Sequence, residues 1–239
     1  MGRKSALQAI LDHGEAACET LGSRLSDEQK SSVGTWEVWA PKDAVCHVAE
    51  WLSRDVSRLS GSDHPAPFVG ADNLDDLNRT IFDTHRDKTW DEAMEFLRSV
   101  ADACRVYLDG LTDEQCEELV DRGDGTSRAV WRTIAGHAGW HLSMHVAAVY
   151  RRAGMTESGT ELERLTARLL GSLDDSDEWQ ASTQYNLACN YALCGDISTA
   201  VRLLREAFRL NPELKEWAKK DPDLDGVRDD PEHSSLYEM

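Results

Sequence analysis

The sequence predicts an all-α protein. Apolar residues recur at three- and four-residue spacing along almost the whole chain of 239 residues, as they do on the buried face of a helix. No segment has the alternating β-branched residues between turn signals that predict strands. Glycine (16 residues) and proline (6 residues) are sparse, and a hydrophobic fraction of 41% with 29% charged residues is typical of a folded domain.

Five long helices are expected in the first 154 residues. Pro41 fits a first helical turn, because proline has no amide hydrogen to lose there. Thr89 and Glu92, three residues apart, resemble a capping box, and Gly110 follows at the other end of that helix. The expected helices cover about residues 3–25, 41–59, 72–86, 90–108 and 131–152. Loops are expected at residues 30–39, at residues 61–70, and around Gly123 and Gly125.

The chain is expected to form two domains, residues 1–154 and residues 160–239. Gly154 ends the last long helix, and the small polar residues at 156–160 predict a hinge. The helices beyond the hinge are expected to be shorter than those before it.

The formal net charge of −18 excludes two classes of partner. Nucleic acid and anionic lipid are both repelled by an acidic surface, so no nucleic acid and no membrane partner is expected. No apolar stretch approaches the roughly 20 residues of a membrane helix, and the first residues lack a signal-peptide core. The six cysteines form no Cys-x-x-Cys pair, which suits buried, reduced thiols. We therefore expect a cytoplasmic protein.

Four histidines on two of the expected helices are candidate metal ligands. His137, His141 and His145 follow at four-residue intervals, which places them on one face of one helix, about 6 Å apart per step. Two neighbours of this set can bind one ion, and His47 on the 41–59 helix is the natural third ligand because its neighbours are apolar. Alternatively these are ordinary hydrogen-bonded histidines, since His-x-x-x-His pairs without the zincin glutamate occur by chance in many helices.

Two motifs resemble those of the DinB/YfiT-like superfamily of metal-binding helical bundles, namely Trp39-x-x-Lys42-Asp43-x-x-x-His47 and His141-x-x-x-His145. The resemblance covers about residues 1–154 and implies an up-down-down-up four-helix core that binds a divalent cation. It also implies which histidines are the ligands, namely His47, His141 and His145, with His137 as their neighbour. Many relatives follow the last histidine with Arg-Gly-Gln, whereas this chain has Val146-Ala-Ala, so substrate contacts from that segment cannot be transferred.

Three neutral imidazoles leave a divalent metal its full charge, which lowers the pKa of a bound water or thiol. Imidazole suits zinc, nickel and iron alike. Zinc is the expected metal, and nickel and iron are the alternatives. Characterised branches of the superfamily that the chain resembles include S-transferases and isomerases that use low-molecular-weight thiols such as bacillithiol and mycothiol. The resemblance therefore implies an activity of this class. We expect a metal-dependent thiol S-transferase, or a related hydrolase or detoxifying enzyme, acting on a small-molecule electrophile.

Glu50 is the candidate catalytic residue outside the ligand set. It lies three residues from His47 on the same helix, where a carboxylate can orient an imidazole or act as a base. The simpler alternative is an ordinary solvated carboxylate on a helix surface. Four tryptophans are candidates to line an apolar pocket, although core packing explains each of them as well: Trp36, Trp39, Trp51 and Trp140.

The second domain contains a pattern that resembles one tetratricopeptide repeat. Its positions are Leu187, Ala188, Tyr191, Gly195, Ala200, Leu204, Ala207 and Pro212. Small residues let two antiparallel helices approach closely, and helices near residues 160–172 and 213–220 are expected to cover the pair. The expected role is docking onto the bundle, a protein partner or a second copy of the chain. The alternative function for the whole chain is therefore a non-catalytic, metal-binding stress or interaction protein.

Overall fold

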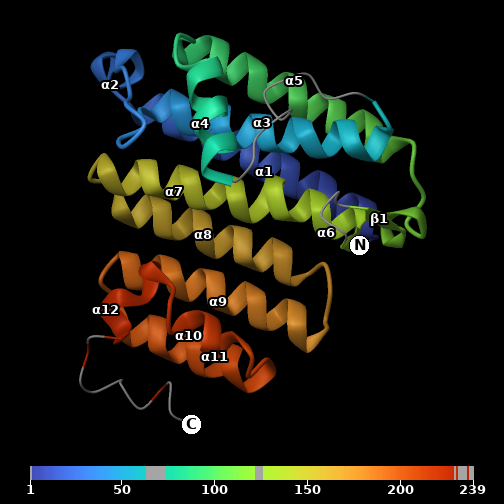
Figure 1. The fold of residues 1–239 in the computed structure, drawn as a ribbon, viewed down its shortest axis with the longest axis vertical. Helices are drawn as coiled ribbons and strands as arrows, with labels where there is room; N and C mark the ends of the chain where they lie inside the picture. The colour runs from blue at the N-terminus through green and yellow to red at the C-terminus, as the bar shows by residue number, and fades with distance from the viewer. Residues whose placement is uncertain (1, 63–73, 122–125, 229, 231–235, 237–239) are drawn as a thin grey trace. The chain divides into compact units, whose positions relative to one another are not determined.

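The computed structural model describes residues 2–62, 74–121, 126–228, 230 and 236, and is all-α apart from one small sheet (Figure 1). The chain divides into two compact units, Met1–Ala153 and Gly154–Met239. Most of the expected loop at 61–70, the start of the expected helix at 72–86, and Gly123 and Gly125 lie outside the described residues. Within those residues, no helix has both the length and the apolar character needed to cross a membrane.

Long helices surround the core of the first unit. They are α1 (Arg3–Arg24), α3 (Pro41–Ser60), α5 (Trp90–Asp109) and α7 (Leu142–Arg152). Helix α1 packs against α5 and α7, and α3 packs against the same two helices. In Figure 1, α3 and α5 run in one direction and α1 and α7 in the other. The fully buried side chains between them include Leu7, Ile10, Leu21, Leu52, Leu97 and Leu108.

Shorter elements complete the first unit. A short helix, α2 (Asp27–Ser31), precedes the expected loop at 30–39 and includes its first two residues. Ser26 caps this helix by accepting a hydrogen bond from the amide of Gln29. Helix α4 (Leu74–His85) follows α3. A 3₁₀ turn, η1 (Gln115–Glu117), leads to an antiparallel hairpin, β1 (Leu119–Asp121) and β2 (Ser127–Ala129). The all-α prediction is confirmed for the fold, and only this hairpin was not predicted, because its three-residue strands are too short to show an alternating pattern.

The last helix of the first unit is interrupted by a π-helical segment, where the sequence predicts a continuous helix. The chain passes from α6 (Val130–Ile134) through η2 (Ala135–His141) to α7. Helix α1 crosses close to this segment, because a Cβ at Gly14 would lie 3.2 Å from the carbonyl oxygen of Ala138. A side chain at Gly14 would therefore push α1 away from η2.

Asp43 secures the start of α3, the helix that carries His47. Its carboxylate accepts hydrogen bonds from the amide of Ala40 at 2.8 Å and from Nζ of Lys42 at 2.9 Å. Both charged side chains are buried, and Lys42 also donates to the carbonyl of Arg86 at 2.6 Å. The pair therefore ties the first turn of α3 to the segment that follows α4.

The second unit is a set of helices with its own core. It contains α8 (Thr156–Gly171), α9 (Asp177–Leu193), α10 (Ile197–Leu210), α11 (Leu214–Ala218), η3 (Pro222–Leu224) and α12 (Asp225–Arg228). The expected hinge at 156–160 is wrong, because these residues form the first turns of α8. Helix α9 packs against both α8 and α10.

The pair α9–α10 has the packing expected of a helical repeat unit. Ala188, Ala200 and Ala207 are fully buried between the helices, and Gly195 turns the chain with a φ of 81°. A left-handed residue at this position favours glycine because other residues are strained there. The assignment to the tetratricopeptide class stays a prediction.

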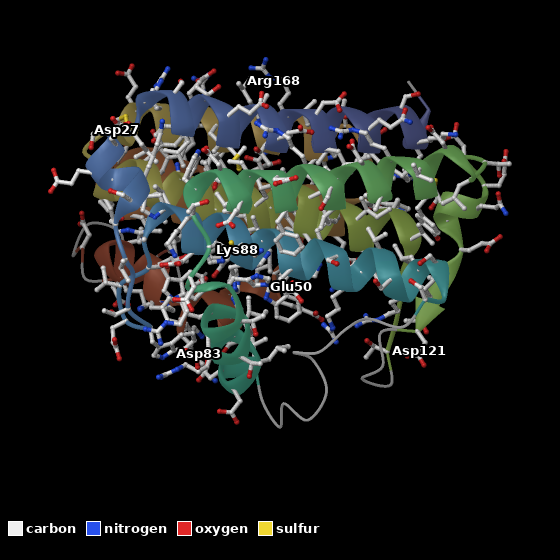
Figure 2. All side chains as sticks on the ribbon, turned by 90° about the horizontal axis from the view of Figure 1, so that it is seen from above. Asp27, Glu50, Asp83, Lys88, Asp121 and Arg168 are labelled. Carbon is white, nitrogen blue, oxygen red and sulfur yellow. The ribbon has the colours of Figure 1, made fainter. Side chains whose placement is uncertain are left out.

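Replacing Asp43 with alanine is expected to lower the free energy of unfolding of the first unit by about 3 kcal/mol, because the buried Lys42 loses its counter-charge. Asp83→Ala is the matched control, since Asp83 lies at the edge of the unit on α4 (Figure 2) and its ion pair with Arg79 is exposed. Urea unfolding of the two variants and the wild type measures the difference. Equal losses in both variants would show that the buried pair adds nothing to stability.

Candidate metal centre

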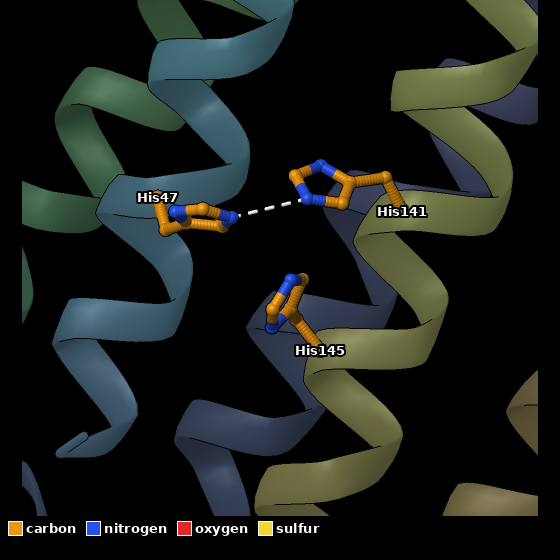
Figure 3. A group of neighbouring side chains, drawn as sticks. All are labelled: His47, His141 and His145. Atoms are coloured by element: carbon orange, nitrogen blue, oxygen red, sulfur yellow. Dashed lines mark hydrogen bonds between the residues drawn. The ribbon is translucent and has the colours of Figure 1, made fainter. Parts of the chain in front are cut away.

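Three histidines from two facing helices meet in the first unit. His47 comes from the second turn of α3, His141 from the end of η2, and His145 from the first turns of α7 (Figure 3). Nε2 of His47 lies 3.1 Å from Nε2 of His141. One ring nitrogen from each of the three residues lies within 4.8 Å of the other two. The structure thus brings together the three residues that the sequence analysis selects as ligands.

Burial keeps these imidazoles uncharged. It is the main reason that the pKa of His47 falls from 6.5 to about 2 and that of His145 to about 4. The pKa of His141 is also lowered well below 6.5, first by burial and then by the charge on neighbouring histidines. Neutral rings whose nitrogens converge, with no carboxylate among them, have the donor set that suits a divalent cation such as zinc, nickel or iron. The residues present therefore fit a metal.

Aromatic packing holds the three rings in place. The Trp39 ring stacks on His145 with centroids 5.7 Å apart and lies 4.7 Å from the ring of His47. Metal-binding histidines usually donate a hydrogen bond from their second nitrogen, which fixes the ring orientation. Among the described residues, no group bonds Nδ1 of His47 or His141. Ring packing therefore takes the orienting role here.

A cavity of about 430 Å³ opens beside the three histidines. Besides these histidines, its walls include Trp39, Trp51, Arg54, Asp55, Arg58, Leu74, Asn78, Arg128, Thr133, His137 and Met144. Two of the four candidate pocket tryptophans, Trp39 and Trp51, thus line it. Trp36 and Trp140 are not part of the wall that the described residues form, and Trp36 instead packs against Trp39.

His137 lines the same cavity and is paired with Asp55. Its Nδ1–H donates to the carboxylate of Asp55, which is 2% exposed, and its ring stacks on Trp51. The ring centroid of His137 lies 5.2 Å from that of His141. The sequence analysis missed Asp55, although a signal exists: Asp55 follows His47 by eight residues, which puts both on one face of α3.

Glu50 does not face this cavity, and the simpler expectation of a solvated carboxylate is wrong. Its side chain is buried, and its Oε2 accepts a hydrogen bond from Nε2–H of His85 at 3.0 Å. His85 comes from the last turn of α4 and stacks on Phe96. Glu50, which is labelled in Figure 2, is therefore a partner of α4, and its catalytic role stays a prediction.

The cysteines of the first unit are poor nucleophiles. Burial raises the pKa of Cys18, Cys46 and Cys104 to about 12, so these thiols remain protonated at neutral pH. Cys116 is buried as well, and all six cysteines of the chain are free. A thiolate that reacts in the cavity would therefore have to come from another molecule.

The lowered pKa values predict how stability depends on pH. Because folding lowers the pKa of His47, His141 and His145 below 6.5, the unfolded chain binds more protons than the folded chain in mild acid. The free energy of unfolding of the metal-free protein is therefore expected to fall as pH drops below about 6.5, by up to about 1.4 kcal/mol per pH unit for each histidine. Above about pH 6.5 the three histidines are mostly neutral in the unfolded chain as well, so their full contribution to the free energy of unfolding is present.

Urea unfolding of chelator-treated protein at several pH values measures this slope. His145→Gln is expected to make the slope shallower, and His13→Gln on α1 is the matched control because it removes a histidine outside the group. The prediction is contradicted when both variants keep the wild-type slope.

The first unit matches one known family. A family model described as the DinB superfamily matches residues 10–149, which is more than half of the chain and includes all three clustered histidines. A comparison with curated proteins finds no match. The matched segment ends before the second unit begins at Gly154. On the match over residues 10–149, the chain belongs to the DinB superfamily.

Proposed function

We propose that the chain is a metal-dependent enzyme that transfers a low-molecular-weight thiol to a small electrophile. One observation carries the proposal: three neutral imidazoles, with nitrogens within 4.8 Å of one another, border a cavity of about 430 Å³. Three protein ligands leave a coordination position open, which is typical of catalytic sites, and a cavity of this size suits a small molecule.

His47, His141 and His145 would hold the metal. When bound, a divalent cation supplies Lewis acidity that lowers the pKa of a thiol or a water beside it. Zinc is our first proposal, and nickel and iron are the alternatives. The buried cysteines support an external thiol, because burial raises the pKa of Cys46, the nearest cysteine in sequence to His47, to about 12.

We further propose that His137 takes the proton released by the thiol. Its Nδ1–H is held by the buried carboxylate of Asp55, so a neutral ring carries its lone pair on Nε2. A carboxylate that orients an imidazole in this way also stabilises the imidazolium that forms when Nε2 accepts a proton. His137 lines the cavity and Glu50 does not, which favours His137 over Glu50 as the base.

The proposal is tested first by metal content. Elemental analysis of protein expressed without added metal is expected to find about one divalent ion per chain in the wild type and in His13→Ala. The ion is expected to be lost in His141→Ala, because two imidazoles hold an ion far less tightly than three. Chelation is expected to lower the melting temperature of the wild type and of His13→Ala but not that of His141→Ala, since a bound ligand stabilises the folded state. A wild type without divalent metal would contradict the proposal.

Activity is the second readout. Metal-loaded wild type is expected to speed the reaction of a low-molecular-weight thiol with at least one of two alkyl bromides, uncharged monobromobimane and anionic bromoacetate; in each reaction a carbon–sulfur bond forms and bromide leaves. His137→Gln is expected to keep the metal and lose about a hundredfold in rate, as for loss of a general base. Bound metal with no acceleration by the wild type would favour the non-catalytic alternative.

The alternative is a metal-binding interaction protein that uses its second unit for protein contacts. Trp217 on α11 favours it, because its side chain is 70% exposed and large exposed aromatics are common at protein interfaces.

If two copies pair through this unit, light scattering is expected to detect a dimer for the wild type and a monomer for Trp217→Ala. Trp131→Phe, a change at a buried tryptophan of the first unit, is the control and is expected to leave the mass unchanged. A wild-type monomer would count against pairing.

A further inference from the structure

Three arginines line the cavity beyond the histidines. Arg54 and Arg58 come from α3, and Arg128 comes from β2. All three side chains are partly buried.

The geometry of α3 puts two of these arginines in line with the metal ligands. His47, Trp51, Arg54 and Arg58 follow at intervals of three or four residues and therefore share one face of the helix. At a rise of 1.5 Å per residue, the backbone of Arg54 lies about 10 Å and that of Arg58 about 16 Å beyond His47. Helical side chains lean back toward the N-terminus, and the guanidinium of Arg54 indeed lies over the ring of Trp51, 5.1 Å from its centroid.

Arg128 approaches the cavity from a different direction. Its Nη1 lies 3.9 Å from the position that a Cβ would take at Gly136, so the side chain reaches from the hairpin to η2. Gly136 directly precedes His137. The arginines thus reach the cavity from both of its sides, α3 on one and the hairpin with η2 on the other.

Among the described residues that line the cavity, cationic side chains outnumber carboxylates. The whole chain carries a net charge of −18, yet the described cavity wall holds three arginines and one carboxylate, Asp55. That carboxylate already accepts a hydrogen bond from His137. Guanidinium groups pair with carboxylate and phosphate through two parallel hydrogen bonds, which makes a group of them a specific anion site.

We propose that the electrophile is a small anion and that Arg54, Arg58 and Arg128 bind its carboxylate or phosphate group. This inference rests on the proposed function only for the identification of the anion as a substrate. Bound in this way, the anion directs the rest of the molecule along Trp51 toward the histidines, where the thiol reacts. Leu74 and Met144, which are 61% and 45% exposed, give the cavity an apolar edge beside the arginines.

Isothermal titration calorimetry of the full chain tests the inference. Succinate and inorganic phosphate serve as probes for the two anionic groups, and uncharged succinamide is the control ligand. Each titration is run on the protein as purified and again after chelation, because an anion that binds only to a metal is lost on chelation. Succinate, phosphate or both are expected to bind in both states, and succinamide in neither.

Arg58→Gln is expected to weaken anion binding about tenfold or more, and Arg58→Lys is expected to restore part of it, since lysine keeps the charge without the planar fork. Arg202→Gln is the matched control, because Arg202 is an exposed arginine of the second unit. Urea unfolding verifies that the variants are folded.

Two results would overturn the inference: no binding of either anion to the wild type, or equal binding by the wild type and Arg58→Gln. Neither result affects the metal content, so the proposed function would stand. Conversely, anion binding that Arg58→Gln weakens in a chain without metal would support the anion site and count against the proposed enzyme.

Discussion

The central constraint on the first unit is that three imidazoles, one buried and two half-buried, must stay uncharged side by side. Nε2 of His47 and Nε2 of His141 are 3.1 Å apart, and two positive charges about 4 Å apart repel by about 4 kcal/mol at an effective dielectric constant of 20. Burial adds a penalty for each charge. The packing of α3 against η2 and α7 brings the three rings together, and Gly14 permits the close approach of α1 to η2. A divalent cation is the partner that such a neutral, lone-pair-rich arrangement can accept.

The sequence was sufficient to select the three histidines that cluster because both signals are local. Four-residue spacing puts His141 and His145 on one helix face, and the motif that begins α3 identifies His47. The eight-residue spacing from His47 could have marked Asp55 as a candidate, but its pairing with His137, 82 residues away, depends on tertiary packing. The same holds for Glu50, whose spacing from His47 suggested a role in the site, whereas its contact with His85 on α4 places it elsewhere.

The arginines illustrate a similar limit. An excess of acidic residues over the chain describes its average field, which ions screen within about 8 Å at physiological salt. A ligand inside the cavity interacts mainly with the side chains within that distance. Arg54 and Arg58 are unremarkable charges on a helix when read in sequence, and only the cavity wall shows that they share a space with Arg128. Composition therefore bears more on large partners, which meet the average field of the chain, than on a small ligand.

The π-helical segment η2 has a consequence for how this site could vary among relatives. A π turn accommodates one residue more than an α turn, so deleting one residue within 135–141 would let the helix become regular. Because the π turn already absorbs the extra residue, the helix on either side of it would keep its orientation, and the change would fall on the residues of the bulge itself. His145 on α7 would keep its place, whereas His137 and His141, which lie within η2, would shift. A deletion of a single residue could thus change which imidazoles face His47 while the rest of the bundle stays in place.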